Sequence, residues 1–267
     1  MAKLKADPIT DRDLARFVAD DSDFAFEMKV LTELRNLGFD CSHSGTYRDP
    51  ITSKIRQFDI RALKREGALM LALAVECKNL RTNHPLLVSA VPRVKAEAFH
   101  NVVVYQDSVV NPAAVKTVQG TDSIYTEGEM VGKKTDQVGR ELPSGDLISD
   151  DSTTFEKLNQ ALNSSKDLVD DAVYDRPPHD VRAVVPALLV PQGTLWQVDY
   201  AAGGGMLVPP RNVTRATIFI DHTWSVKAAF GPQDYHLSHL EVITLDALRT
   251  TVDYWFGESG FFRAFRK

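Results

Sequence analysis

The chain has 267 residues, of which 43% are hydrophobic and 25% charged, as in folded globular proteins. Its two cysteines, Cys41 and Cys77, are too few for a disulfide scaffold and predict a reduced, cytoplasmic setting. The formal net charge of −5 argues against a protein that coats nucleic acid, and no apolar stretch reaches membrane-spanning length, so no membrane partner is expected.

The charges are unevenly distributed along the chain. Residues 51–100 carry nine Lys or Arg against four Asp or Glu, a local excess of +5. Residues 140–185 carry five against ten, a local excess of −5. Ordinary variation in surface charge explains this difference about as well as a cationic wall around a phosphate-binding cleft, and both interpretations stay open.

The N-terminal part predicts a helix followed by three strands. Apolar residues recur at helical spacing over residues 24–37, residues 20–23 (Asp-Asp-Ser-Asp) supply candidate N-caps, and Gly38 is a natural stop. The three strands are expected at residues 41–48, 55–63 and 69–78. The last is an unbroken apolar run, which is typical of a central strand covered on both faces.

The rest of the chain predicts an insertion, a second helix and further strands. Residues 80–150 are interpreted as a long insertion, because residues 120–151 are polar, rich in glycine and typical of a loop. The following elements are expected as a helix at 153–173, strands at 181–190, 194–200, 215–220 and 240–245, and a last helix at 246–256.

This order of elements predicts a single α/β domain over residues 1–267, built on a mixed central sheet. The core is assigned to about residues 20–80 and 150–192. Residues 193–267 are interpreted as a C-terminal embellishment of extra strands and a helix.

Charged residues gather where the two best strands end. Glu76 and Lys78 are two residues apart and therefore share a strand face, and Asp59 lies near the end of the neighbouring strand. Two adjacent carboxylates repel each other unless a cation lies between them. With the backbone carbonyl of Cys77 as a further oxygen ligand, this donor set suits Mg²⁺ or Mn²⁺, and Lys78 is expected to neutralise charge on a phosphate.

Glu27 is expected near the N-terminal end of the first helix, where it could orient a metal-bound water or add a ligand. The acid-x-Lys pattern arises readily by chance, and Glu27-Met28-Lys29 is a second example in this chain. That example lies in a helix, where residues two apart do not face each other. Glu76 and Lys78 lie instead at the tip of a buried strand, where charges are costly unless the strand simply emerges into solvent there.

Together these residues resemble the PD-(D/E)xK nuclease superfamily, which has the restriction-endonuclease-like fold. The resemblance covers about residues 20–80 and implies an αβββαβ core with a Mg²⁺-dependent endonuclease activity, most naturally on DNA. It implies that Asp59 and Glu76 are metal ligands, that Lys78 is the catalytic lysine and that Glu27 is the acidic residue of the first helix. Phe58 stands where the superfamily's motif has proline.

Basic residues near this constellation are candidate contacts to a nucleic-acid backbone, although a solvated face explains them at least as well. They are Lys54, Arg56, Arg81, Arg93 and Lys95. A homodimer would place two such sites across a duplex, but the sequence shows no interface.

Two further hypotheses stay open. The net acidity also suits a non-catalytic module with the same fold that binds DNA or a protein partner. A different metal hydrolase could use the acids and histidines of residues 234–241, which include His236 and His239. Surface or partly buried histidines explain that second cluster better, because metal-ligand spacing is undefined in a loop or strand.

Overall fold

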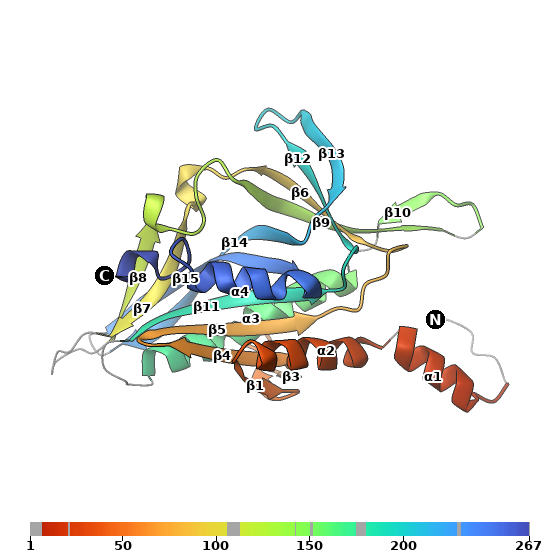
Figure 1. Cartoon of the computed structure of the whole chain (residues 1–267), viewed down its shortest axis with the longest axis horizontal. Coiled ribbons are helices and arrows are strands. Elements are labelled where there is room, and N and C mark those ends of the chain that lie inside the picture. Colours follow the sequence, from red (N-terminus) through yellow and green to blue (C-terminus); the bar gives the residue numbers. More distant parts are fainter. Residues whose placement is uncertain are drawn as a thin grey trace.

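The computed structural model describes residues 7–20, 22–105, 113–141, 143–149, 152–174, 180–228 and 231–266. Helix α1 (Asp11–Asp20) extends away from the rest of the protein, and α2 (Asp23–Asn36) packs against the sheet (Figure 1). The second helix confirms the prediction for residues 24–37. It ends before Gly38, whose φ of 83° lies in the left-handed region that glycine adopts without strain.

The described part of the chain forms a thirteen-stranded mixed sheet and a separate two-stranded ribbon. Along its main path the sheet contains β1 (Asp40–His43), β4 (Ile60–Glu66), β5 (Leu69–Cys77), β11 (Val181–Val190), β15 (Gly231–Thr244), β14 (Arg215–Ala228), β9 (Met130–Arg140), β6 (Leu86–Pro92), β12 (Leu195–Tyr200) and β13 (Met206–Asn212). Off this path are β7 (Phe99–Tyr105), β8 (Ala113–Gln119) and β10 (Leu147–Ser149), and the ribbon contains β2 (Thr46–Arg48) and β3 (Ile55–Gln57). Strand β11 is parallel to both β5 and β15, whereas β4 is antiparallel to β5, which confirms a mixed sheet in an α/β protein.

Helices cover both faces of the central strands. Leu71, Leu73 and Val75 of β5 pack with residues of α2 and α4 (Leu248–Phe256), while Ala72 and Ala74 pack with residues of α3 (Ser152–Tyr174). This alternation follows from the pleat, which sends successive side chains to opposite faces. Figure 1 shows α2 and α4 in front of the sheet and α3 behind it. None of the helices among the described residues combines the length and apolarity needed to cross a membrane.

The interpretation of residues 120–151 as a loop is wrong. They contain β9, which is 11 residues long and pairs antiparallel with β6 over residues 130–137, and β10, which pairs with the end of β9. Gly132, inside β9, lies against Val88 and Ile218 with no room for a Cβ, so close strand packing explains this glycine. The wider insertion at 80–150 supplies β6 to β10 and is therefore part of the sheet.

The C-terminal part does more than embellish the core. Strand β15 lies directly beside β11, with Glu241 opposite Ala187, in the centre of the sheet. The strands expected at 215–220 and 240–245 are each longer than predicted, because β14 and β15 pair along most of their length. The assignment of a single domain stays a prediction.

Candidate functional site

Asp59 lies at a break between β3 and β4, in a stretch predicted to be one strand. The backbone N–H of Phe58 donates to the carbonyl of Gly45 over 3.0 Å, and its ring fills the space where a Cβ on Gly45 would lie. The guanidinium of Arg61 covers the same ring at 4.3 Å. A proline at position 58 would have no N–H for this bond. The local structure therefore explains why phenylalanine stands where the nuclease motif has proline.

The two carboxylates predicted as metal ligands lie together. Strands β4 and β5 are antiparallel with Ile60 opposite Val75, and this register places Asp59 beside Glu76. Oδ2 of Asp59 accepts a hydrogen bond of 2.8 Å from the backbone N–H of Cys77, and the backbone N–H of Asp59 donates to Oε1 of Glu76 over 3.4 Å. Glu76 is fully buried.

A lysine of α3 lies between these carboxylates. Nζ of Lys157 donates to Oδ2 of Asp59 over 2.7 Å and to Oε2 of Glu76 over 3.0 Å. Burial, reinforced by the charge of Asp59, raises the pKa of Glu76 to about 8. Burial by itself would lower the pKa of Lys157, but the two carboxylates raise it, so the ammonium stays charged.

Sequence reasoning missed Lys157. Phe155, an apolar residue near the start of the helix, is 58% exposed, whereas Ala161 and Ser164 are buried. Lys157 lies four residues before Ala161 and seven before Ser164, so it continues the buried row of α3 toward the acids. The spacing of four and seven residues between Lys157 and these small residues is the one local signal in the sequence that could have identified Lys157.

Lys78, predicted as the catalytic lysine, contacts a different acid. Its Nζ lies 3.1 Å from Oδ2 of Asp23, the first residue of α2, and the backbone N–H of Asn79 donates to the other oxygen of Asp23 over 2.8 Å. Because β5 ends at Cys77, the alternation that was used to align Lys78 with Glu76 does not extend to it. The contact with both carboxylates that was expected of Lys78 is made by Lys157 instead.

Glu27 lies at the edge of the same cluster. Its carboxylate lies 3.3 Å from Nε2 of His43, the last residue of β1. Burial and then the negative charge of Asp59 raise the pKa of Glu27, so the two acids influence each other. No motif in the sequence marks His43, since a single histidine at the end of a short strand has no distinctive spacing.

The side chain of Cys77 lies on the other face of β5 from Glu76. The thiol packs in the core with residues of α2 and α4, and burial raises its pKa well above the ordinary range. Its backbone N–H points to Asp59. In a strand the N–H and C=O of one residue point to the same edge, so the Cys77 carbonyl faces the side on which Asp59 lies, and its role as a ligand stays a prediction.

The donor set fits a small divalent cation only in part. Among the described residues, no group of three or more His, Cys, Asp or Glu side chains is arranged to hold a metal ion. Mg²⁺, however, is commonly bound by one or two carboxylates and completes its coordination with water. Asp59 and Glu76 already share the ammonium of Lys157 as a cation, so they suit Mg²⁺ or Mn²⁺ once that ammonium moves aside.

We expect the affinity of the protein for Mn²⁺ to rise with pH up to about 8, because protons compete for Glu76, whose pKa is raised to about 8. Between pH 6.5 and 8.5 the expected gain is on the order of tenfold, since one pKa unit corresponds to one factor of ten in protonation. Calorimetric titration at the two pH values measures it. Glu76→Gln is expected to remove most of this dependence, and equal affinities of the wild type at both pH values would contradict the prediction.

The histidines near residues 234–241 do not form a shared site. His236 and His239 are three residues apart in β15, so they lie on opposite faces of the strand. His236 is bonded to Thr223 over 2.9 Å at the exposed surface. His239 is buried and stacked on Tyr125, and burial together with the charge of Arg93 lowers its pKa to about 2, which keeps it neutral.

The basic residues predicted to contact nucleic acid differ in their exposure. Arg93 is buried and donates to Nε2 of His239 over 3.1 Å, and its contact with a nucleic-acid backbone stays a prediction. Arg56 pairs with Asp49 at 3.2 Å and lines a cavity of about 520 Å³ beside α3. The remaining candidates are exposed, and their contact with nucleic acid stays a prediction: Lys54, Arg81 and Lys95.

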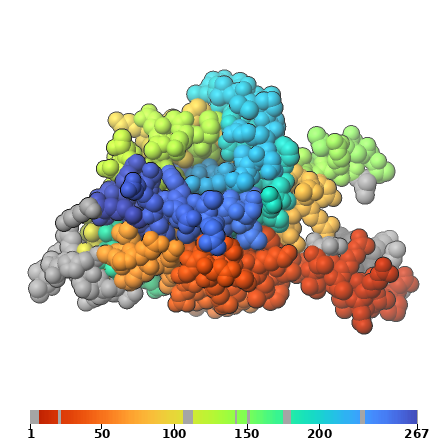
Figure 2. Space-filling view, in the orientation of Figure 1, coloured from red at the N-terminus to blue at the C-terminus, as the bar shows by residue number. Residues whose placement is uncertain are grey.

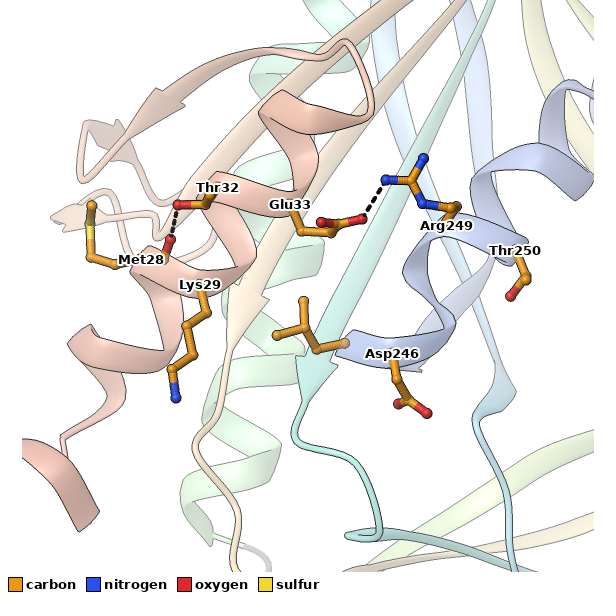
Figure 3. Close-up of a pocket in the computed structure, with 8 residues that line it drawn as sticks. Met28, Lys29, Thr32, Glu33, Asp246, Arg249 and Thr250 are labelled. Atoms are coloured by element: carbon orange, nitrogen blue, oxygen red, sulfur yellow. Dashed lines mark hydrogen bonds and ion pairs between the residues drawn. The ribbon is translucent and has the colours of Figure 1, made fainter.

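A larger cavity lies apart from the acidic cluster. It has a volume of about 680 Å³ between α2 and the segment formed by η3 (Leu245–Ala247) and α4. Figure 3 shows Glu33 of α2 and Arg249 of α4 pointing toward each other, with an ion pair of 3.0 Å between them. None of the residues that meet at Lys157 lines this groove.

Comparison with known proteins found no match: no protein-family model, no curated protein and no solved structure matches the chain. The functional interpretation therefore depends on the geometry of the residues themselves.

Proposed function

We propose that this protein is a metal-dependent nuclease that hydrolyses phosphodiester bonds, with DNA as the preferred substrate. The observation that carries the proposal is the convergence of Asp59 and Glu76 on one cation, the ammonium of Lys157, at 2.7 and 3.0 Å. Burying two carboxylates and a lysine lowers the stability of the fold. Buried charged groups of this kind are common at the active sites of enzymes, where the reaction requires them.

The proposal includes a restriction-endonuclease-like core. Its support is the order α2, β1, β4, β5, α3 and β11, in which Asp59 directly precedes β4 and Glu76 lies at the end of β5. This order corresponds to the αβββαβ arrangement, with the β2–β3 ribbon inserted between β1 and β4. The strands β6 to β10 and β12 to β15 extend that core into a wider sheet.

Each residue of the cluster has a role in the proposed reaction. Asp59 and Glu76 would hold Mg²⁺, which would supply polarisation of the phosphate and a lowered pKa of a bound water molecule. Lys157, attached to the same cluster through a flexible side chain, neutralises negative charge that develops on the phosphate oxygens. Glu27, with its raised pKa, accepts a proton from the attacking water, and His43 orients its carboxylate.

The cavity beside α3 supports this substrate class. It is lined by side chains of the β2–β3 ribbon and of α3, among them the polar Arg56, Asn159 and Gln160 and the apolar Phe155. Glu156, which lines it, is the immediate neighbour of Lys157 in the helix. A phosphate backbone that follows this cavity would therefore run beside the helix that carries Lys157.

Incubation of the protein with supercoiled plasmid tests the proposal directly. We expect nicked and linear products with Mg²⁺ or Mn²⁺, and intact plasmid when EDTA is added. A parallel incubation with a structured RNA of similar length distinguishes the two nucleic acids. Intact plasmid and intact RNA with both metals would contradict the proposal.

One observation favours a second candidate, a non-catalytic nuclease-fold module that binds DNA or a protein partner. Lys157 already satisfies Asp59 and Glu76 without a metal, as a structural ion pair would. Calorimetry with Mn²⁺ separates the candidates, because the module has no need of a metal. Absence of Mn²⁺ binding by the folded protein would favour the module over the nuclease.

A further inference from the structure

A polar cavity of about 440 Å³ lies on the opposite face of the sheet from Glu76. Arg215 pairs with Ile243 across β14 and β15, and Ile243 packs with Trp255 of α4, whereas Ala74, on the same face as Glu76, packs with α3. The β12–β13 hairpin rises above α4 and β14 beside this region (Figure 1), and Figure 2 shows the hairpin in cyan standing above the blue C-terminal residues.

Three arginines line this cavity, and two of them form ion pairs with buried acids that lie outside the lining. Arg215 donates from Nε and Nη2 to the two carboxylate oxygens of Glu241, both at 2.8 Å, and Glu241 is fully buried. Arg211 donates from Nη1 to Asp199 over 2.6 Å, and Asp199 also accepts a bond of 2.7 Å from Gln197. These acids fix the guanidinium groups without lining the cavity themselves.

The third arginine, Arg93, is fixed by several partners. Its Nε donates to the neutral His239, and its Nη1 donates to the carbonyl of Thr126 over 2.8 Å and to Glu129 over 3.1 Å. The side chain of Glu129 is 57% exposed. It is the one acid among the described residues that line the cavity, which therefore has three cationic side chains against one anionic side chain.

Each of the three guanidinium groups has one carboxylate partner, Glu241, Asp199 or Glu129, so an anion in the cavity would be bound by the donors that these carboxylates leave unused. Each arginine keeps donors beyond those that its partners use. Glu241, for example, accepts from two of the three nitrogens of Arg215, and within the described part of the chain Nη1 has no acceptor. Tyr254, whose ring lies 5.3 Å from the Arg215 guanidinium, and Gln197 add neutral polar groups to the lining.

We propose that this cavity is a binding site for a small, multiply charged phosphate compound. Guanidinium groups match phosphate oxygens with paired, charge-assisted hydrogen bonds, and here buried acids fix them before a ligand arrives. The volume of the cavity suits a small molecule. The proposal does not depend on the nuclease activity, because none of the residues that meet at Lys157 lines this cavity.

Calorimetric titration with inorganic pyrophosphate, at fixed ionic strength and with EDTA to exclude metal-bridged binding, tests this site. We expect saturable binding of one pyrophosphate per chain. Arg211→Gln is expected to weaken it by about tenfold or more, because a hydrogen bond to a charged group is lost. The side chain of Arg211 is 44% exposed and Gln197 still bonds to Asp199 in this variant, so the fold is expected to remain intact.

Two further variants sharpen the result. Arg249→Gln removes an exposed arginine of α4 that pairs with Glu33 outside the cavity, and it is expected to bind pyrophosphate as the wild type does. Glu129→Gln removes the anion of the lining and is expected to tighten binding severalfold. Absence of saturable binding by the wild type, or equal affinities of the wild type and Arg211→Gln, would overturn the proposal. Tighter binding of citrate than of pyrophosphate would overturn the assignment to phosphate.

Discussion

Asp59→Asn and Glu76→Gln are each expected to lower the rate of metal-dependent plasmid cleavage on the order of 10³-fold, comparable to the loss of a group that stabilises transition-state charge. Both substitutions keep the size of the side chain and an oxygen that can accept from Lys157. They remove the negative charge with which the two carboxylates attract a divalent cation. The measurement is the initial rate of plasmid nicking at saturating Mg²⁺, together with the affinity for Mn²⁺.

A matched control is Glu33→Gln, which neutralises an acid on the same helix as Glu27. Glu33 pairs with Arg249 at the surface and does not contact the acidic cluster, so the rate of cleavage is expected to remain that of the wild type. Near-identical cleavage by the wild type, the two site variants and the control would exclude this site from the reaction. A loss of cleavage without a loss of Mn²⁺ affinity would contradict the assignment of Asp59 and Glu76 as metal ligands.

Lys157→Met is expected to lower the free energy of unfolding by about 3 kcal/mol at pH 8.5, because it leaves two carboxylates facing each other without their cation. The folded-state pKa of Glu76 is raised above its ordinary value near 4.5 to about 8. Protonation of Glu76 therefore stabilises the fold at low pH, and this contribution is lost as the pH rises through about 8. The destabilisation by Lys157→Met is accordingly expected to be smaller at pH 5 than at pH 8.5.

Urea denaturation at the two pH values, with and without Mn²⁺, measures this effect. Mn²⁺ is expected to restore stability to Lys157→Met and to bind it more tightly than it binds the wild type, since the ammonium no longer competes for the carboxylates. Lys166→Met is the matched control, because Lys166 lies on the same helix in an ion pair with Asp170 that is expected to contribute at most about 0.5 kcal/mol. Equal destabilisation by both lysine substitutions, or no response of Lys157→Met to Mn²⁺, would contradict a cation site at Lys157.

Local patterns in the sequence identified the strand that carries Glu76 and the elements packed beside it. The apolar residues of α2 are spaced as in a helix, and those of β5 and β11 form unbroken runs as in a buried strand. The bounds of these three elements agree closely with the predictions. The meeting of Asp59 and Glu76 could also be predicted, because a short turn joins β4 to β5 and places the two residues at the same end of adjacent strands.

Other elements depended on partners far away in the chain. Strand β9 is polar and contains Gly132, so its sequence is typical of a loop, yet β6 on one side and β14 on the other hold it in the sheet. The C-terminal segments, which were expected to embellish the core, also depend on distant partners. Strand β15 is central in the sheet because it pairs with β11. Pairing between distant segments leaves no periodicity within either one that would identify its neighbour.

The sequence by itself determined the α/β class, the central apolar strands and the pair of acids at their ends, since these follow from spacing within short segments. Only the tertiary structure decided which lysine joins those acids and which arginines are buried. Lys157 is 81 residues from Glu76, and Arg93 is 146 residues from His239. The energy of a charged side chain depends on the groups that surround it in space, and for these residues folding alone brings those groups together.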